Sequence, residues 1–136
     1  MKKSFSKIYN SNPEFLPEIE KFILDTIEKE IKLDPQKKDS IEIVISEAAA
    51  NSIIHGNRKD PNKKVAIKIM LDANKIVISF KDEGVGFKPE NVPDPTQPEN
   101  ILKGSGRGLH IMKSLADDIK YKFTKNTTEL IVTFNI

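Results

Sequence analysis

The spacing of apolar residues changes along this chain of 136 residues, and the change constrains the fold more than any other feature. Between residues 15 and 55 the apolar positions recur every three to four residues, as on one face of an amphipathic helix. From residue 65 most of them alternate, as on one face of a strand. Helices followed by a strand-rich remainder predict a two-layer α/β sandwich (class α+β), with one sheet and the helices packed on one of its faces.

The length and composition fit one soluble globular domain spanning residues 1–136, with 38% apolar and 31% charged residues. Twenty-two Lys and Arg against 20 Asp and Glu leave a net charge of +2, which gives no strong field toward nucleic acid or an anionic membrane. The absence of Cys excludes disulfides, thiolate metal sites and cysteine nucleophiles. No signal-peptide pattern and no run of about 18 apolar residues occurs, so we expect a cytoplasmic location.

Three helices are predicted. The first covers residues 15–31, and a loop around a proline follows over residues 32–38. The second runs from a capping-box-like start at Asp39 to about His55, with Gly56 as a left-handed C-terminal cap. The third opens near residue 108 and reaches about residue 118.

Five strands are predicted, at residues 3–9, 65–71, 76–80, 121–123 and 130–134. The first would be an edge strand. The second and third would form a hairpin through the Asp72–Asn74 turn. Residues 88–103 carry four of the eight prolines and no clear period, so a long loop is expected there.

A first polar pattern lies on the second predicted helix, where Glu47 and Asn51 are four residues apart and share one face. His55 would continue the stripe. A carboxamide oxygen can bind a hard cation, and a neighbouring carboxylate can accept a proton from an attacking hydroxyl. Taken alone, the pattern also fits a polar helix face in water.

A second pattern, Asp82–Phe87, comes directly after the second hairpin strand. Asp82 could accept a hydrogen bond from an exocyclic amine, while Gly84 and Gly86 would let the backbone approach a flat ligand. Taken alone, this pattern also fits a simple strand-ending turn.

A third pattern, Gly104–Leu109, runs into the third predicted helix. Glycine-rich backbone at a helix N-terminus offers free N–H groups and the positive end of the helix dipole to phosphate. The pattern is neither a Walker P-loop nor a dinucleotide fingerprint. A flexible hinge before the helix is the alternative.

The order of the three patterns is more specific than each one. A helical Glu-x-x-x-Asn, a strand-borne Asp-x-Gly-x-Gly-Phe and a Gly-x-Gly-x-Gly before a helix resemble the Bergerat-fold ATPases, the GHKL superfamily that includes gyrase and sensor histidine kinases. The details EAAANSIIHGN, DEGVGF and GRGLHIM are most similar to the anti-sigma-factor serine kinases of the RsbW type. The resemblance covers nearly the whole chain, and it implies one mixed, mostly antiparallel sheet.

The resemblance also implies ATP and Mg²⁺ as ligands and a role for each matching residue. Glu47 would be the general base, and Asn51 would bind Mg²⁺ that bridges the phosphates. Asp82 would bind the adenine amine, and Gly84 and Gly86 would shape the side of the pocket that contacts the base.

The remaining positions carried over by resemblance lie in the third pattern and the last strand. The lid and phosphate cradle would consist of Gly104, Ser105, Gly106, Arg107, Gly108 and Leu109. Thr128 stands where relatives have the threonine of a Gly-Thr pair beside the adenine carboxylate. Thr127 replaces the glycine in this sequence.

The implied function is that of a serine kinase that phosphorylates a small anti-anti-sigma protein, binds a sigma factor or similar regulator, and forms a homodimer. Direct binding to nucleic acid or membrane is not expected. One alternative is a binding module that sequesters its partner without catalysis, but pure binding would not need Glu47. Another is a histidine-kinase catalytic domain that acts on a separate protein.

Overall fold

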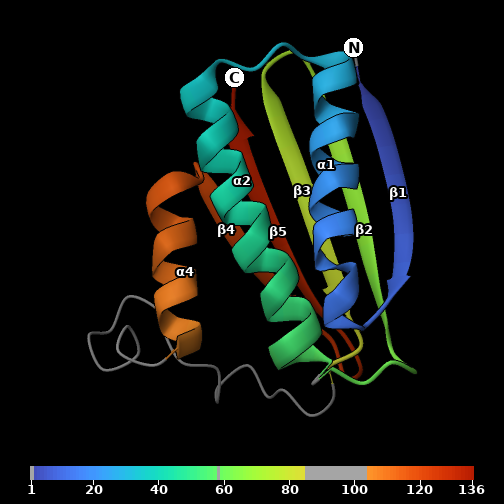
Figure 1. Cartoon of the computed structure of the whole chain (residues 1–136). Coiled ribbons are helices and arrows are strands. Elements are labelled where there is room, and N and C mark those ends of the chain that lie inside the picture. The colour runs from blue at the N-terminus through green and yellow to red at the C-terminus, as the bar shows by residue number, and fades with distance from the viewer. Residues whose placement is uncertain (1, 58, 85–103) are drawn as a thin grey trace.

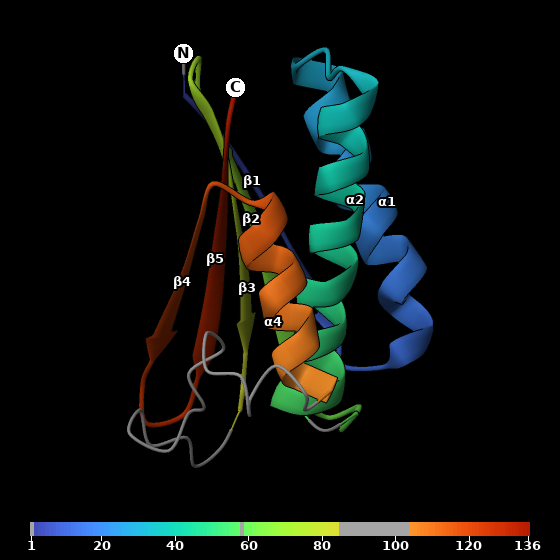
Figure 2. The ribbon, with the colours of Figure 1, turned by 90° about the vertical axis from the view of Figure 1, so that its left-hand side faces the viewer.

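The computed structural model describes residues 2–57, 59–84 and 104–136. Its elements are β1 (Lys3–Asn10), the 3₁₀ helix η1 (Pro13–Phe15), α1 (Leu16–Glu30), α2 (Pro35–Ala50), the π-helix η2 (Asn51–Gly56), β2 (Lys64–Leu71), β3 (Lys75–Asp82), α4 (Gly104–Leu115), β4 (Asp118–Phe123) and β5 (Thr128–Asn135). The helices form one layer and the strands the other (Figures 1 and 2). The predicted two-layer sandwich is therefore confirmed.

The five strands form one sheet in the order β1-β2-β3-β5-β4. Every strand pair among the described residues is antiparallel, so this sheet is not mixed. The predicted β2–β3 hairpin is confirmed, and its turn is closed by the Asp72 side chain, which accepts hydrogen bonds from the backbone N–H groups of Asn74 (2.7 Å) and Lys75 (2.9 Å).

The core lies between the two layers, because alternate strand residues face the helices. The fully buried large side chains of the sheet are Ile67, Ile69, Ile76, Ile78, Phe80 and Phe134. They face the fully buried isoleucines of α1, α2 and η2, which are Ile19, Ile23, Ile27, Ile41, Ile45 and Ile53. Each such side chain contributes about 1.5–3 kcal/mol by its removal from water, which fixes the helices over the sheet.

Two predicted helix boundaries are wrong. Helix α2 begins at Pro35 rather than Asp39, because Asp34 caps it by accepting a hydrogen bond from the backbone N–H of Lys37 (2.8 Å) and proline suits the first turn. The predicted loop over residues 32–38 is therefore shorter. Helix α4 covers Gly104–Leu115, four residues earlier at its start than predicted.

The end of the second predicted helix also differs. The chain is π-helical from Asn51 to Gly56, and the backbone of Gly56 is not left-handed. Lys59 has the positive φ, at 60°, and its N–H donates to the carbonyl of Ile53 (2.7 Å). The predicted continuation of the polar stripe to His55 lies outside the described side chains.

The predicted long loop over residues 88–103 lies outside the described residues, as does Gly86. None of the described helices combines the length and the apolar character that a membrane span requires.

Candidate functional site

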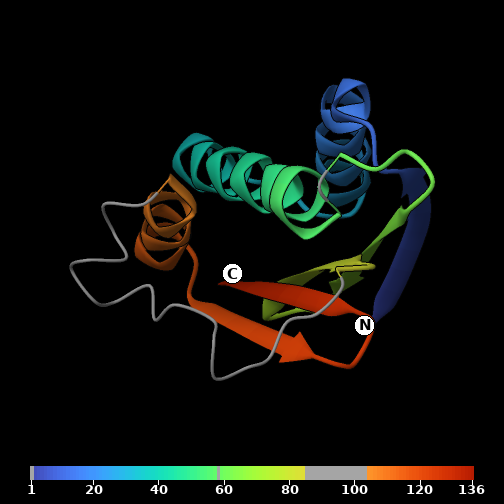
Figure 3. The same cartoon turned by 90° about the horizontal axis from the view of Figure 1, so that it is seen from below.

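The predicted site residues that the structure describes with their side chains form two clusters where the helices meet the sheet. Asp82 ends β3, Thr128 begins β5, and the two residues are paired across the sheet. The last turns of the second helix, η2, lie against β3. Seen from below in Figure 3, α4 runs beside α2 over the same face of the sheet.

Asp82 is the centre of the first cluster. Its side chain is only 4% exposed, and its Oδ1 accepts a hydrogen bond from the backbone N–H of Gly84 at 2.8 Å. A Cβ on Gly84 would lie 2.8 Å from Oδ1, and a Cβ on Gly56 would overlap the Oδ2 side of the carboxylate. A side chain at either position would therefore require the carboxylate to move from its present place.

Burial raises the pKa of Asp82 from 3.8 to about 6, while the hydrogen bond from Gly84 and the charge of Lys63 act in the opposite direction. The carboxylate is thus mostly ionised at neutral pH but easily protonated below it. Tyr121 on β4 lies in the same neighbourhood. Burial, and then the negative charge of Asp82, raise the pKa of its hydroxyl.

Thr128 completes this cluster. Its Oγ1 is buried, 3.3 Å from the position of a Cβ on Gly84, and has no hydrogen-bond partner within the part of the chain that the structure describes. A buried hydroxyl without a partner costs free energy unless a ligand or water satisfies it. A buried carboxylate and a free hydroxyl side by side suit a ligand with polar groups along one edge.

Asn57 is a site-supporting residue that sequence reasoning missed. It is fully buried, its Nδ2 donates to the carbonyl of Lys64 (2.9 Å), and its Oδ1 accepts from the backbone N–H of Glu83 (2.8 Å). The Glu83 carboxylate in turn accepts a hydrogen bond from the backbone N–H of Lys64. Asn57 therefore ties the end of η2 to β2 and to the residue after Asp82. From the sequence, Asn57 follows Gly56 and looks like part of an ordinary polar loop.

Glu47, Asn51 and Gly108 form the second cluster. A Cβ on Gly108 would lie 2.7 Å from Oε2 of Glu47 and 3.9 Å from Nδ2 of Asn51. The acid and the amide are thus close to each other and to the backbone of α4, as the sequence predicted. Amide oxygens are ligands that Mg²⁺ accepts together with phosphate oxygens, so Asn51 is the residue of this pair that fits that ion.

The π-helix η2 connects the two clusters, since it begins at Asn51 and ends at Gly56. One short element therefore carries both the amide beside Glu47 and the glycine beside Asp82. Such π-helical turns occur frequently at functional sites.

The predicted phosphate cradle forms the first turns of α4. Its first four backbone N–H groups, from Gly104 to Arg107, have no partner within the helix, and they carry the positive end of the helix dipole. The side chains of residues 104–107 lie outside the described part. Leu109 is half-buried and packs against the core.

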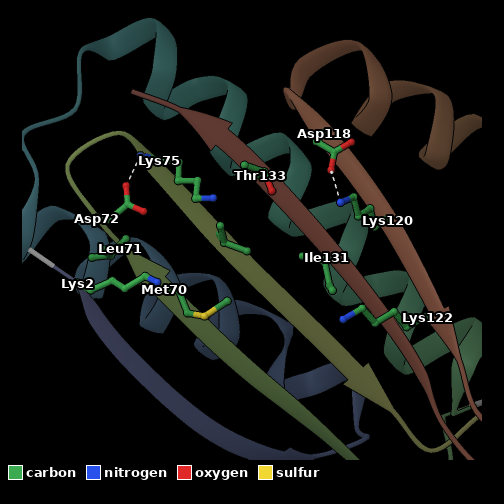
Figure 4. Close-up of a pocket in the computed structure, with 11 residues that line it drawn as sticks. Lys2, Met70, Leu71, Asp72, Lys75, Asp118, Lys120, Lys122, Ile131 and Thr133 are labelled. Carbon is green, nitrogen blue, oxygen red and sulfur yellow. Dashed lines mark hydrogen bonds and ion pairs between the residues drawn. The ribbon is translucent and has the colours of Figure 1, made fainter.

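A groove of about 320 Å³ lies on the opposite face of the sheet (Figure 4). It is lined by Met70, Val77 and Ile131 and by charged residues at its rim, among them Lys75 and Asp118. None of the predicted site residues lines this groove, so it is a separate surface.

Comparison with known proteins gives one family for most of the chain. The family of histidine kinase-like ATPase domains matches residues 9–134. The anti-sigma F factor of Geobacillus sp. strain WCH70 is 36% identical over 105 residues, which are 71% of this chain and 70% of that protein. The anti-sigma F factor of Oceanobacillus iheyensis is 39% identical over 95 residues, which are 65% of this chain and 64% of that protein.

Solved structures of low identity share the fold. The RsbU and RsbW domains of Rv1364c from Mycobacterium tuberculosis match 97% of this chain over 32% of theirs, with a TM-score of 0.70 and 16% identity. The nucleotide-free catalytic domain of the histidine kinase ThkA matches 96% of this chain over 97% of its own, with a TM-score of 0.62 and 18% identity.

Proposed function

This chain belongs to the histidine kinase-like ATPase family, with anti-sigma F factors among its relatives, and we propose that it is a Mg-ATP-dependent protein serine kinase of the anti-sigma type. Its proposed substrate is a serine of a small anti-anti-sigma protein, and its proposed regulatory partner is a sigma factor or similar regulator in the cytoplasm. The observation that carries the proposal is the Glu47–Asn51 pair, held against α4 and joined through η2 to the buried Asp82.

Recognition of adenine is assigned to the first cluster. The carboxylate of Asp82 accepts a hydrogen bond from the exocyclic amine, because an ionised carboxylate is an acceptor only. The hydroxyl of Thr128, buried beside it, can donate to a ring nitrogen or to a water that bridges to the ring. The absence of side chains at Gly56 and Gly84 leaves room for the carboxylate of Asp82 itself, and Gly86 extends the same stretch in the sequence.

Phosphoryl transfer is assigned to the second cluster. Bound Mg-ATP supplies the transferable phosphoryl group and the cation that neutralises its charge. Asn51 contributes an oxygen ligand for that cation, and the first turns of α4 donate backbone N–H groups to the phosphates. Glu47, which reaches the same part of α4 as Asn51, would accept the proton of the substrate serine as the serine oxygen bonds to the γ-phosphorus and the bond from that phosphorus to ADP breaks.

The alternative is a module that binds ATP and sequesters its partner without catalysis. The close placement of Glu47 beside Asn51 favours the kinase, since binding alone needs no base. The test is to incubate the protein with Mg-ATP and candidate anti-anti-sigma proteins and to measure the intact mass of each. The kinase predicts one added phosphate on a serine, stable to acid.

Glu47→Ala provides the decisive variant for that test. It should bind ATP with near wild-type affinity and lose transfer by a factor of about 10²–10⁴, the usual contribution of a general base. Undiminished transfer by the variant would remove Glu47 from this role, and an acid-labile phosphate on a histidine would favour the histidine-kinase alternative.

A homodimer is also proposed, through the face of the sheet that carries the groove of Figure 4. The half-buried Met70, Val77 and Ile131 give this face an apolar centre. Its rim carries both signs of charge, with lysines and aspartates that two copies related by a twofold axis can pair. Ile131→Glu should convert the dimer to a monomer in light-scattering chromatography, while a wild-type mass for the variant would place the contact elsewhere.

A further inference from the structure

We propose that Gly56 is a positioning residue for base recognition, because its missing side chain keeps Oδ2 of Asp82 in place as the acceptor for the adenine amine. The inference rests on the proposed function, in which Asp82 binds the base. It adds a residue of η2 to the site and assigns separate roles to the two carboxylate oxygens.

The geometry separates the two oxygens of Asp82. Oδ1 accepts the hydrogen bond from the backbone N–H of Gly84 at 2.8 Å, which holds the carboxylate in its orientation. Oδ2 is the atom nearest to the place where a Cβ on Gly56 would be, and Cγ would be only 2.5 Å from that Cβ. An alanine at position 56 therefore cannot coexist with the present position of the carboxylate.

The backbone of η2 has little freedom to move away and relieve this overlap. The N–H of Asn57 donates to the carbonyl of Ser52 (2.8 Å), and the Asn57 side chain is hydrogen-bonded to both β2 and the residue after β3. The N–H of Lys59 donates to the carbonyl of Ile53 at 2.7 Å. An added methyl group should instead rotate the side chain of Asp82 and break its bond to Gly84.

Rotation of the Asp82 carboxylate should weaken recognition of the adenine base without a general loss of nucleotide binding. The phosphate end of the site, at Glu47 and Asn51, is at the other end of η2. Contacts to the triphosphate should therefore survive the substitution. The preference for a base with an exocyclic amine over a base with a carbonyl at the same position should be lost.

The experiment compares Mg-ATP with Mg-ITP, which carries a carbonyl oxygen in place of the adenine amine, by calorimetry on the full chain. Wild-type protein should prefer ATP by about 10- to 100-fold, as expected for a hydrogen bond to a charged group. Gly56→Ala should bind ATP about 10- to 100-fold more weakly and bind ITP within about twofold of wild type. Unchanged ATP preference in a folded Gly56→Ala protein would overturn the inference.

Two further variants separate the possible causes of a changed ATP preference. Asp82→Ala should also lose the ATP preference, and if it retains that preference the proposed base site itself is wrong. If Asp82→Ala loses it and Gly56→Ala does not, only the role of Gly56 is refuted. Lys59→Gly changes the backbone of the same turn at a positive φ, which favours glycine, and should leave the preference unchanged.

The double variant Gly56→Ala/Asp82→Ala tests the inference even if Gly56→Ala does not fold. Removal of the carboxylate should restore stability, because the methyl group then has nothing to overlap. The melting temperature of the double variant should match that of Asp82→Ala. If the methyl group destabilises both backgrounds equally, its effect does not pass through Asp82 and the inference fails.

Discussion

Asp82→Asn should increase the stability of the nucleotide-free protein at neutral and alkaline pH. Burial raises the pKa of Asp82 to about 6 in the folded state, against 3.8 for an unperturbed carboxyl. Its contribution to stability is therefore fully present below about pH 3.8 and is lost as the pH rises through about 6. The difference between the two pKa values corresponds to a loss of about 3 kcal/mol in the free energy of unfolding once the pH is well above 6. Roughly 1 to 2 kcal/mol of it falls between about pH 5 and pH 8.

The assay is urea unfolding of wild type and Asp82→Asn without nucleotide, at about pH 5 and pH 8. The stability of the variant relative to wild type should rise between these pH values by roughly 1 to 2 kcal/mol. The amide cannot ionise, and its oxygen can still accept from Gly84. An equal difference at both pH values would show that the buried carboxylate has an ordinary pKa and would refute the reasoning.

Asp72→Asn is the matched control, because the pKa of Asp72 is lowered and its effect on stability should have the opposite pH dependence. Backbone hydrogen bonds from Asn74 and Lys75 hold the pKa of this exposed carboxyl below 3.8, with the first the larger cause. Its contribution to stability is present above about pH 3.8 and is lost as the pH falls. Asp72→Asn should therefore be less stable than wild type at about pH 8, and this deficit should vanish at strongly acidic pH.

Three other substitutions test separate parts of the account. Thr128→Val should stabilise the nucleotide-free protein by about 1 kcal/mol in urea unfolding, since its buried hydroxyl has no partner among the described residues, and should weaken ATP binding. Asp34→Ala should cost about 1 kcal/mol as the loss of an N-cap, while Asp39→Ala, inside α2, should cost much less; equal losses would contradict the observed helix start. Asn51→Ala should weaken Mg-ATP binding in calorimetry by about tenfold or more, and wild-type affinity would exclude it as a ligand.

The fold was predictable from sequence because its core residues recur at the regular spacings of a helix and of a strand. The buried isoleucines at 19, 23 and 27 mark one face of α1, and alternating residues such as Ile67 and Ile69 mark one face of β2. Helix ends were less predictable, since Asp34–Pro35 and Asp39–Glu42 both offer start signals. The structure decides between them through the Asp34 side chain, which caps α2 by accepting from the N–H of Lys37.

The candidate site was predictable in part. The pairing of Glu47 with Asn51 follows from helical spacing. Thr128 was placed beside Asp82 only by the family resemblance, and the sheet register pairs the two residues. The role of Gly56 could not be deduced, because a glycine after a helix usually indicates a left-handed cap. Its actual neighbour, Asp82, is 26 residues away in the sequence, and only the folded structure brings them together.

A crystal structure of the chain with Mg²⁺ and a non-hydrolysable ATP analogue tests the central claim most directly. We predict the adenine amine on Oδ2 of Asp82, the amide oxygen of Asn51 on the cation, and the phosphates over the first turns of α4. A nucleotide bound on another surface, or a base that does not contact Asp82, would contradict the account.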